Sequence, residues 1–393
     1  MFLLPYLLKI KKVLFIVSLF CSFSVMTGCW DQRELNTLAL VTASSFDLDA
    51  NNNVIATVQI FTPQGTSSSG GSGGSGGSSG TGAQGSNLVI SGKGSTISDA
   101  VNNIETRVSR HLFRGQNAVI VFGHDFAKKR LKEGLDYAAR FYEIKERTLI
   151  YVAKDHGVDL LQYRPNIERN SADVMEYLTE KNANLGMSLK DVILMRLGPN
   201  KPVILPIIGV KQLRVKGNPE HMFLTLGSAI FANDRLVGTI DHHDTYGQRL
   251  IYNEFNQTVF PLHLKGHSGQ VSLNIQSVKT ATHSAIKDGK WIITVKVSGK
   301  GIVFENTTNQ SLFKVKTEHK IEKEVNKRLR SIIKHSVKQT QHMNSDVMNF
   351  HGVFYREHPD EYNKVSHNWE DIYPRIDVKV NGHINVYDPG MIE

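Results

Sequence analysis

The placement of the two cysteines constrains this chain more than any other feature of its sequence. Cys21 and Cys29 both lie near the N-terminus, and residues 30–393 contain no cysteine. A body built from those residues has no disulfide bond, no cysteine ligands for structural zinc and no cysteine nucleophile. It has to be stabilised by packed cores, and a hydrophobic content of 40% is enough to build them.

A basic segment and then an apolar segment precede Cys29. Residues 1–12 carry three lysines and no acidic residue, and the apolar run of residues 13–26 follows. This order is typical of a secretory signal peptide. The run is also shorter than the ~20 residues that a membrane-spanning helix normally needs. We therefore predict that residues 1–28 are a signal peptide.

The apolar run ends in Met26-Thr27-Gly28-Cys29, which resembles the bacterial lipobox. In that motif, small residues precede a cysteine that becomes the diacylated first residue of the mature chain. Thr27 and Gly28 fit the motif, whereas Met26 stands where leucine is usual. The alternative is an ordinary buried cysteine beside a plain anchor helix. Two acyl chains on Cys29, at ~0.8 kcal/mol per buried methylene, would hold the protein at one membrane face.

The formal net charge is +9, and it falls to +6 without Lys9, Lys11 and Lys12 of the predicted signal peptide, which is mild for a chain of this length. Such a balance suits a position beside an anionic lipid surface, and by itself it is no signature of nucleic-acid binding. Residues 65–86 are a low-complexity tract of glycine and serine. We expect this tract to be a flexible, exposed insertion in a loop between two strands.

Apolar periodicity predicts an α+β fold, with mixed sheets flanked by helices. The expected strands cover residues 38–46, 54–61, 88–90, 118–122, 148–153, 203–210, 223–231, 236–240, 259–264, 270–286, 291–305 and 375–386. The first expected helix is capped by Ser98 or Thr96 and runs to about residue 110. The other expected helices cover residues 126–142, 172–183, 189–197, 245–255, 313–341 and 346–356.

The chain length and two breaks in the pattern suggest three domains after the signal peptide. Three prolines between residues 199 and 206 mark the first expected boundary, and residues 266–269 mark the second. The predicted units are an N-terminal α/β domain, a small middle α/β domain, and a C-terminal domain with a long β-hairpin and a long amphipathic helix, over residues 29–198, 199–266 and 267–393.

No motif predicts a metal or cofactor site. Asp241-His242-His243-Asp244 is the densest cluster of possible ligands. Adjacent residues on a strand or turn point to different sides and rarely bind one ion, so solvated turn histidines are expected. Residues 92–96 (GKGST) hint at a phosphate loop but lack its spacing. A strand-to-helix turn is the better interpretation.

No catalytic residue is predicted either. The acidic groups at residues 357–361 and 370–371 can be drawn as a general acid and base, but surface charge explains them equally well. The helix over residues 313–341 has a basic face that includes Lys320, Lys323 and Lys327. This face suits anionic lipid, peptidoglycan or an acidic partner, or is simply solvated. It lacks the interleaved aromatics that stacking on nucleic acid requires.

Six segments, in this order, resemble the C-subunit lipoproteins of spore germinant receptors, Ger(x)C. They are residues 29–35 (CWDQREL), 92–101 (GKGSTISDAV), 136–140 (DYAAR), 151–154 (YVAK), 346–352 (DVMNFHG) and 369–374 (WEDIYP). The glycine and serine tract looks like an insertion where relatives have a shorter loop. Residues 350–352 stand where a Gly-Phe-Gly-like turn is more typical.

The resemblance implies a three-domain lipoprotein on the outer face of the spore inner membrane, held by lipid on Cys29. It implies assembly with a larger A subunit and a multi-spanning B subunit to sense nutrients such as amino acids, sugars or nucleosides. It implies no enzymatic activity, and whether this subunit touches the nutrient is left open. The alternatives are a solute-binding lipoprotein of a transporter and a lipid-anchored cell-wall hydrolase.

Overall fold

A computed structural model describes residues 14–16, 18, 37–61, 87–165, 167–181, 186–215, 218–254 and 257–388. The predicted lipobox (Met26, Thr27, Gly28 and Cys29) and the tract of residues 65–86 lie outside these ranges. The chain divides into a unit of residues 1–38 and a unit of residues 39–393. Within the described ranges, every helix is too short or too polar to span a lipid bilayer.

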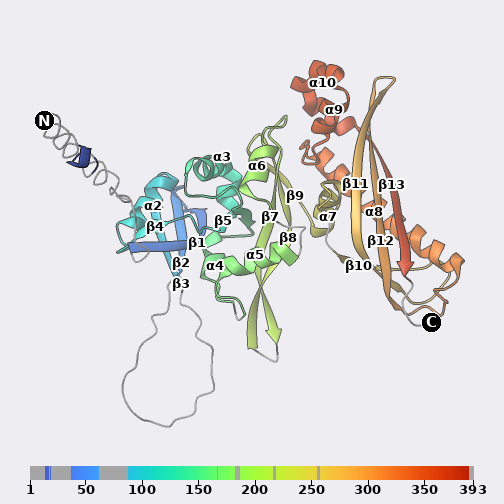
Figure 1. Ribbon diagram of the computed structural model, residues 1–393, viewed down its shortest axis with the longest axis horizontal. Helices are drawn as coiled ribbons and strands as arrows, with labels where there is room; N and C mark the ends of the chain where they lie inside the picture. The colour runs from blue at the N-terminus through green and yellow to red at the C-terminus, as the bar shows by residue number, and fades with distance from the viewer. Residues whose placement is uncertain are drawn as a thin grey trace, which may run out of the picture. The chain divides into compact units, whose positions relative to one another are not determined.

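The first sheet has nine strands and mixes parallel and antiparallel pairs (Figure 1). Its order is β3-β2-β1-β5-β6-β7-β8-β9, and β4 pairs with β1. The strands are β1 (Leu38–Leu48), β2 (Val54–Phe61), β3 (Asn87–Gly94), β4 (His111–Phe113), β5 (Val119–Phe122), β6 (Leu149–Ala153), β7 (Val203–Val215), β8 (Asn218–Ala232) and β9 (Arg235–Ile240).

Helices pack on both faces of this sheet. In β5, Ile120 and Phe122 join one core and Val119 and Val121 the other, because successive side chains of a strand point to opposite faces. All four are fully buried, so the strand forms a continuous apolar run in the sequence. The first core includes α2 (Ile97–Glu105), α3 (His124–Arg140) and α6 (Leu189–Met195), and the second includes α4 (Gly157–Gln162) and α5 (Ser171–Lys181).

The second sheet has four strands, in the order β10-β11-β12-β13. They are β10 (Thr258–Leu262), β11 (Val271–Lys287), β12 (Lys290–Asn306) and β13 (Asp377–Asp388). β11 and β12 form the predicted hairpin, in which Lys287 pairs with Lys290. Asp288 and Gly289 lie between them with φ of 50° and 73°. Two positive φ values in a two-residue loop match the twist of the strands, which explains the Asp-Gly sequence.

The long helix α8 (Val315–His342) packs its apolar side against this second sheet (Figure 1). The buried positions recur every three or four residues, as the sequence predicts. They are Ile321, Val325, Leu329, Ile332, Ile333 and Val337, each at most 1% exposed. The side chain of Asn326 fixes β13 beside the helix, because its Oδ1 accepts a hydrogen bond from the Ile384 amide at 2.8 Å.

A second helix, α7 (His242–Ile251), packs closely on α8. A Cβ at Gly247 would lie 2.6 Å from the Cβ of Ser336, so the two helices approach at a distance that only glycine allows. Ser336 Oγ donates a hydrogen bond to the carbonyl of Asp244 at 2.7 Å. His335 Nδ1 also lies 2.6 Å from the Asp244 carboxylate. Polar contacts therefore hold α7 in register along α8.

A buried carboxylate organises the segment after α8. Asp346 accepts hydrogen bonds from the amides of Phe350 and His351 at 2.9 and 2.8 Å, and from Trp369 Nε1 at 3.0 Å. These bonds join the start of α9 (Phe350–Glu357) to α11 (Trp369–Ile372), while α10 (Pro359–Val365) lies between them in the chain.

The α+β fold and most of the predicted elements are confirmed. The long helix and the hairpin agree with prediction to within a few residues. The short elements β4, α4, α10 and α11 were not predicted, since they span seven residues or fewer and show no clear periodicity. β7 pairs with β6 through Val152 and Ile207, within the first sheet. The division into three domains stays a prediction.

Gly247→Ala tests the contact between α7 and α8. Alanine favours an α-helix by about 1 kcal/mol over glycine, but overpacking a tight contact costs about 1–3 kcal/mol. We expect the clash with Ser336 to exceed the gain, which lowers the free energy of unfolding in urea melts by roughly 1 kcal/mol. Ser331→Ala, on the exposed side of α8, is the control and should be neutral. A Gly247→Ala chain of increased stability would contradict this packing.

Candidate functional site

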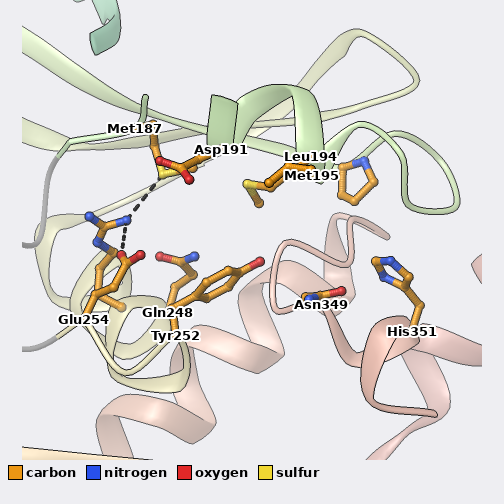
Figure 2. A pocket seen from close by; sticks show the side chains of 11 residues that line it. Met187, Asp191, Leu194, Met195, Gln248, Tyr252, Glu254, Asn349 and His351 are labelled. Carbon is orange, nitrogen blue, oxygen red and sulfur yellow. Dashed lines mark hydrogen bonds and ion pairs between the residues drawn. The ribbon is translucent and has the colours of Figure 1, made fainter. Parts of the chain in front are cut away.

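A cavity of about 210 Å³ lies where α6, α7 and the start of α9 meet (Figure 2). Its apolar wall comes from Met187, Leu194, Met195 and Pro202. The polar residues that line it are Asp191, Gln248, Arg249, Tyr252, Glu254, Asn349 and His351. The cavity has the size of a small molecule, and both signs of charge are present in its lining.

An ion pair forms one side of the cavity. Arg249 is only 8% exposed, and its Nη1 lies 2.5 Å from Glu254 Oε2. The Arg249 guanidinium also donates to the carbonyl of Gly186 at 3.0 Å. Burial lowers the pKa of Arg249 and raises the pKa of Glu254, because a charged group loses hydration there. While both groups are ionised, their opposite charges cancel, and the pair adds no net charge to the cavity.

The side chain of Gln248 is the unusual feature of this site. It is 1% exposed, and neither Nε2 nor Oε1 has a hydrogen-bond partner among the residues that the structure describes. Figure 2 shows the amide between Glu254 and Tyr252, facing the cavity. Leaving a buried polar group unpaired costs about 1–3 kcal/mol. A small molecule with an adjacent donor and acceptor would satisfy both amide groups.

Tyr252 completes this polar side. Burial raises the pKa of its phenol, and the negative charges of Asp346 and Glu254 raise it further. The phenol is therefore neutral at physiological pH and can donate a hydrogen bond. Together the lining offers hydrogen bonds and apolar contact to a ligand. It pairs no serine or cysteine nucleophile with a general base.

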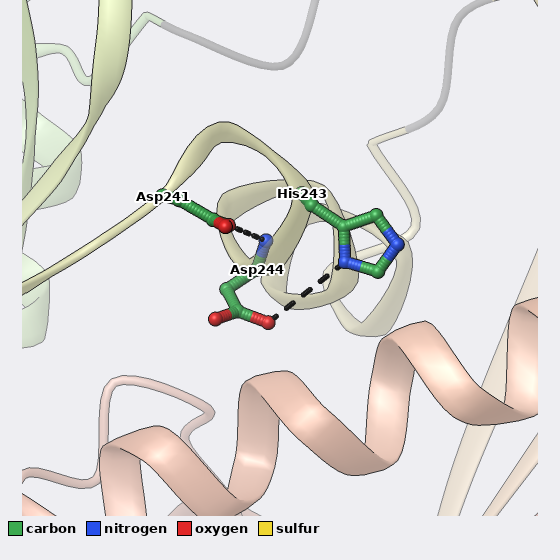
Figure 3. A group of neighbouring side chains, drawn as sticks. All are labelled: Asp241, His243 and Asp244. Carbon is green, nitrogen blue, oxygen red and sulfur yellow. Dashed lines mark hydrogen bonds and ion pairs between the residues drawn. The ribbon is translucent and has the colours of Figure 1, made fainter.

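The structure brings Asp241, His243 and Asp244 together, and their ligand atoms lie within 4.8 Å of one another (Figure 3). The expectation that these neighbours face different sides is wrong for these three. The reason is local, since Asp241 caps α7 and residues 242–244 form its first turn. Asp241 Oδ1 accepts from the Asp244 amide at 2.8 Å, as an N-cap does. With Asp244 bonded to His335 across to α8, capping and packing account for this cluster.

The other sequence candidates have structural roles. Glu357 accepts hydrogen bonds from Ser284 Oγ at 2.8 Å and from His283 at 3.2 Å, which ties α9 to the β11–β12 hairpin. Asp360 and Glu361 lie in the first turn of α10, and Glu370 and Asp371 in that of α11. Acidic side chains stabilise that end of a helix.

The glycines of the GKGST segment serve the packing of β3 on α2. A Cβ at Gly92 would lie 2.3 Å from the carbonyl oxygen of Ala100, and one at Gly94 would lie 2.3 Å from the Ala100 amide. Thr96 caps α2 and accepts from the Asp99 amide at 3.2 Å. The predicted strand-to-helix turn is confirmed.

Sequence reasoning did not identify Gln248, Arg249 or Glu254. All three lie within the helix predicted over residues 245–255, without a motif that marks them. In the structure Gln248 and Arg249 lie in α7, and Glu254 follows its end. The sequence holds only a weak signal that these polar side chains are buried. A glutamine and an arginine adjacent in a short helix are usually exposed, and only the fold shows that both are buried.

Comparison with known families identifies the chain. The family described as "Spore germination protein N-terminal domain" matches residues 31–210, and that described as "Spore germination B3/ GerAC like, C-terminal" matches residues 226–390. The chain belongs to the GerAC-like family of spore germination proteins. The resemblance to the Ger(x)C proteins is thereby confirmed.

Individual relatives match over nearly their whole length. "Spore germination protein KC" of Bacillus subtilis (strain 168) is 26% identical, over 95% of this chain and 96% of the relative. "Putative spore germination protein YfkR" of the same strain is 24% identical, over 94% of each chain. The structure described as "Crystal Structure of the GerBC protein" matches 91% of this chain and 100% of its own, with a TM-score of 0.56 and 18% identity. The two proteins share a fold.

Proposed function

We propose that this chain is the lipid-anchored C subunit of a spore nutrient germinant receptor, and that it acts with A and B membrane subunits without catalysing a reaction. The observation that carries the proposal is the family match, which begins at residue 31, close behind the lipobox cysteine Cys29. That spacing is expected of a mature lipoprotein whose folded body follows its acylated first residue.

The proposed mechanism is scaffolding at the outer face of the spore inner membrane. Acyl chains on Cys29 confine the body to a thin layer next to its membrane partners. Confinement raises the effective concentration of the partners for one another, so a contact that is weak in free solution becomes well populated. Two acyl chains give far more durable attachment than one.

Two observations support a role without catalysis. The acidic pairs that the sequence offers as general acid and base bond to neighbouring elements or lie at helix N-termini. The residues that line the cavity offer hydrogen bonds and apolar contact to a bound ligand. The cell-wall hydrolase alternative therefore gains no support from the described residues.

We propose, as a second candidate function, that the cavity binds a small polar solute. The unpaired amide of Gln248 favours it. A solute-binding role of this kind is compatible with a receptor subunit and does not require a transporter.

Cys29→Ala tests the anchoring hypothesis in the spore. We expect the altered protein to leave the membrane fraction and nutrient-triggered germination to fall sharply, because the body is no longer confined beside its partners. Cys21→Ala, which removes a cysteine from the predicted signal peptide alone, should leave both unchanged. Retained attachment and normal germination in the Cys29→Ala strain would defeat the hypothesis.

Thermal unfolding of purified protein tests the cavity. A panel of amino acids, sugars and nucleosides is screened against the unaltered chain and against Gln248→Met, which has a similar volume and no amide. A true ligand should raise the melting temperature of the unaltered chain by several degrees and that of the variant much less. If nothing in the panel discriminates between the two proteins, a solute site at Gln248 is not supported.

A further inference from the structure

The solvent side of α8 carries one continuous row of positive charge. Its members are Lys316, Lys320, Lys323, Lys327, Arg330, Lys334 and Lys338, here named the α8 basic stripe, and all seven are exposed. Their spacing of three or four residues places them within about 80° of arc along about 33 Å of helix. Most of the buried apolar residues of α8 lie on the opposite side, so the stripe faces solvent.

The acidic residues of α8 are turned away from the stripe or engaged elsewhere. Glu318, Glu322 and Glu324 are half-buried. Glu322 Oε1 accepts from the Val386 amide of β13 at 3.2 Å, and Glu324 pairs with Lys327 at 3.9 Å. Over the part of the chain that the structure describes, no ion pair joins a carboxylate to the remaining six members of the stripe. The positive charge is therefore largely uncompensated within the protein.

Such a row is unfavourable for an isolated helix. Like charges three or four residues apart repel one another, and here that spacing repeats along most of the helix. An anionic surface laid along the row would relieve the repulsion. Arg328 is also exposed, but it does not belong to this row, because it lies roughly 120° around the helix from Lys316.

The chemistry of the stripe favours a lipid surface as the partner. Six of its seven members are lysines, which present point charges on flexible stems. A cluster of about four to eight basic residues on an amphipathic helix is typical of surfaces that bind anionic lipid head groups. Val315, the first residue of the same helix, is 62% exposed, and Phe313, two residues before it, is 54% exposed. Exposed apolar side chains beside lysines are typical of helices that lie on membranes.

We propose that the α8 basic stripe binds the phosphate groups of anionic phospholipids, as a second membrane contact in addition to the anchor. Binding of the stripe to anionic lipid does not depend on the proposed function. The identity of the membrane at which this contact forms does rest on the proposed function. A single acylated residue lets the body rotate on its tether. A charged row along one helix would hold the second sheet at a fixed orientation to the bilayer.

Vesicle sedimentation tests the proposal. The full mature chain with Cys29→Ser, which has no acyl chain, is mixed with vesicles of phosphatidylglycerol and phosphatidylcholine or of phosphatidylcholine alone. Binding is expected to the anionic vesicles only, and it should weaken strongly as the salt concentration rises, because ions screen the contact. Equal binding to both kinds of vesicle would overturn the proposal.

Matched charge reversals locate the contact. Lys323→Glu with Lys327→Glu should reduce the affinity for anionic vesicles at least tenfold. Lys128→Glu with Lys132→Glu makes the same change at the same spacing on the exposed side of α3, and it should have little effect. Lys323→Gln with Lys327→Gln, with folding checked by circular dichroism, guards against a misfolded variant and should weaken binding less than the reversal.

Two results would count against a lipid partner. Equal loss of binding in the α3 control would show that net charge, and not the stripe, is responsible. Tighter binding to soluble polyglutamate or to peptidoglycan fragments than to anionic vesicles would assign the stripe to an acidic partner of another class.

Discussion

Burial of the apolar side of α8 on the four-stranded sheet is the interaction on which the rest of the described structure depends. It brings the long hairpin, β13 and α9 into one core. It also places α7 at the helix surface, where Gly247 permits the close approach to Ser336. Beyond the end of α8, Ser345 Oγ donates to the carbonyl of Phe231 in β8 at 2.7 Å, which ties this core to the first sheet.

The same burial determines what the helix shows to solvent. A 3.6-residue period with one apolar side leaves the opposite side to charged residues, and in α8 those residues are almost all basic. In the account proposed here, lipid on Cys29 supplies durable attachment and the stripe supplies orientation. Acylation with a polybasic surface is a combination in which each contact strengthens the other.

Much of this fold could be predicted from the sequence because its signals are local. The Asp288-Gly289 turn, the period of α8 and the buried run of β5 each follow from a few neighbouring residues. The cavity could not be predicted, since Met187, Gln248 and His351 meet only through the tertiary fold. The convergence of Asp241 and Asp244 was missed because it depends on where α7 begins, and helix ends are the least certain part of such a prediction.

The central claim is that Cys29 is the acylated first residue of the mature protein, and mass spectrometry of the native N-terminal peptide tests it most directly. The account predicts a peptide that begins at Cys29 and carries the mass of a diacylglyceryl group. An unmodified Cys29, or a peptide that still includes the preceding leader, would contradict the account.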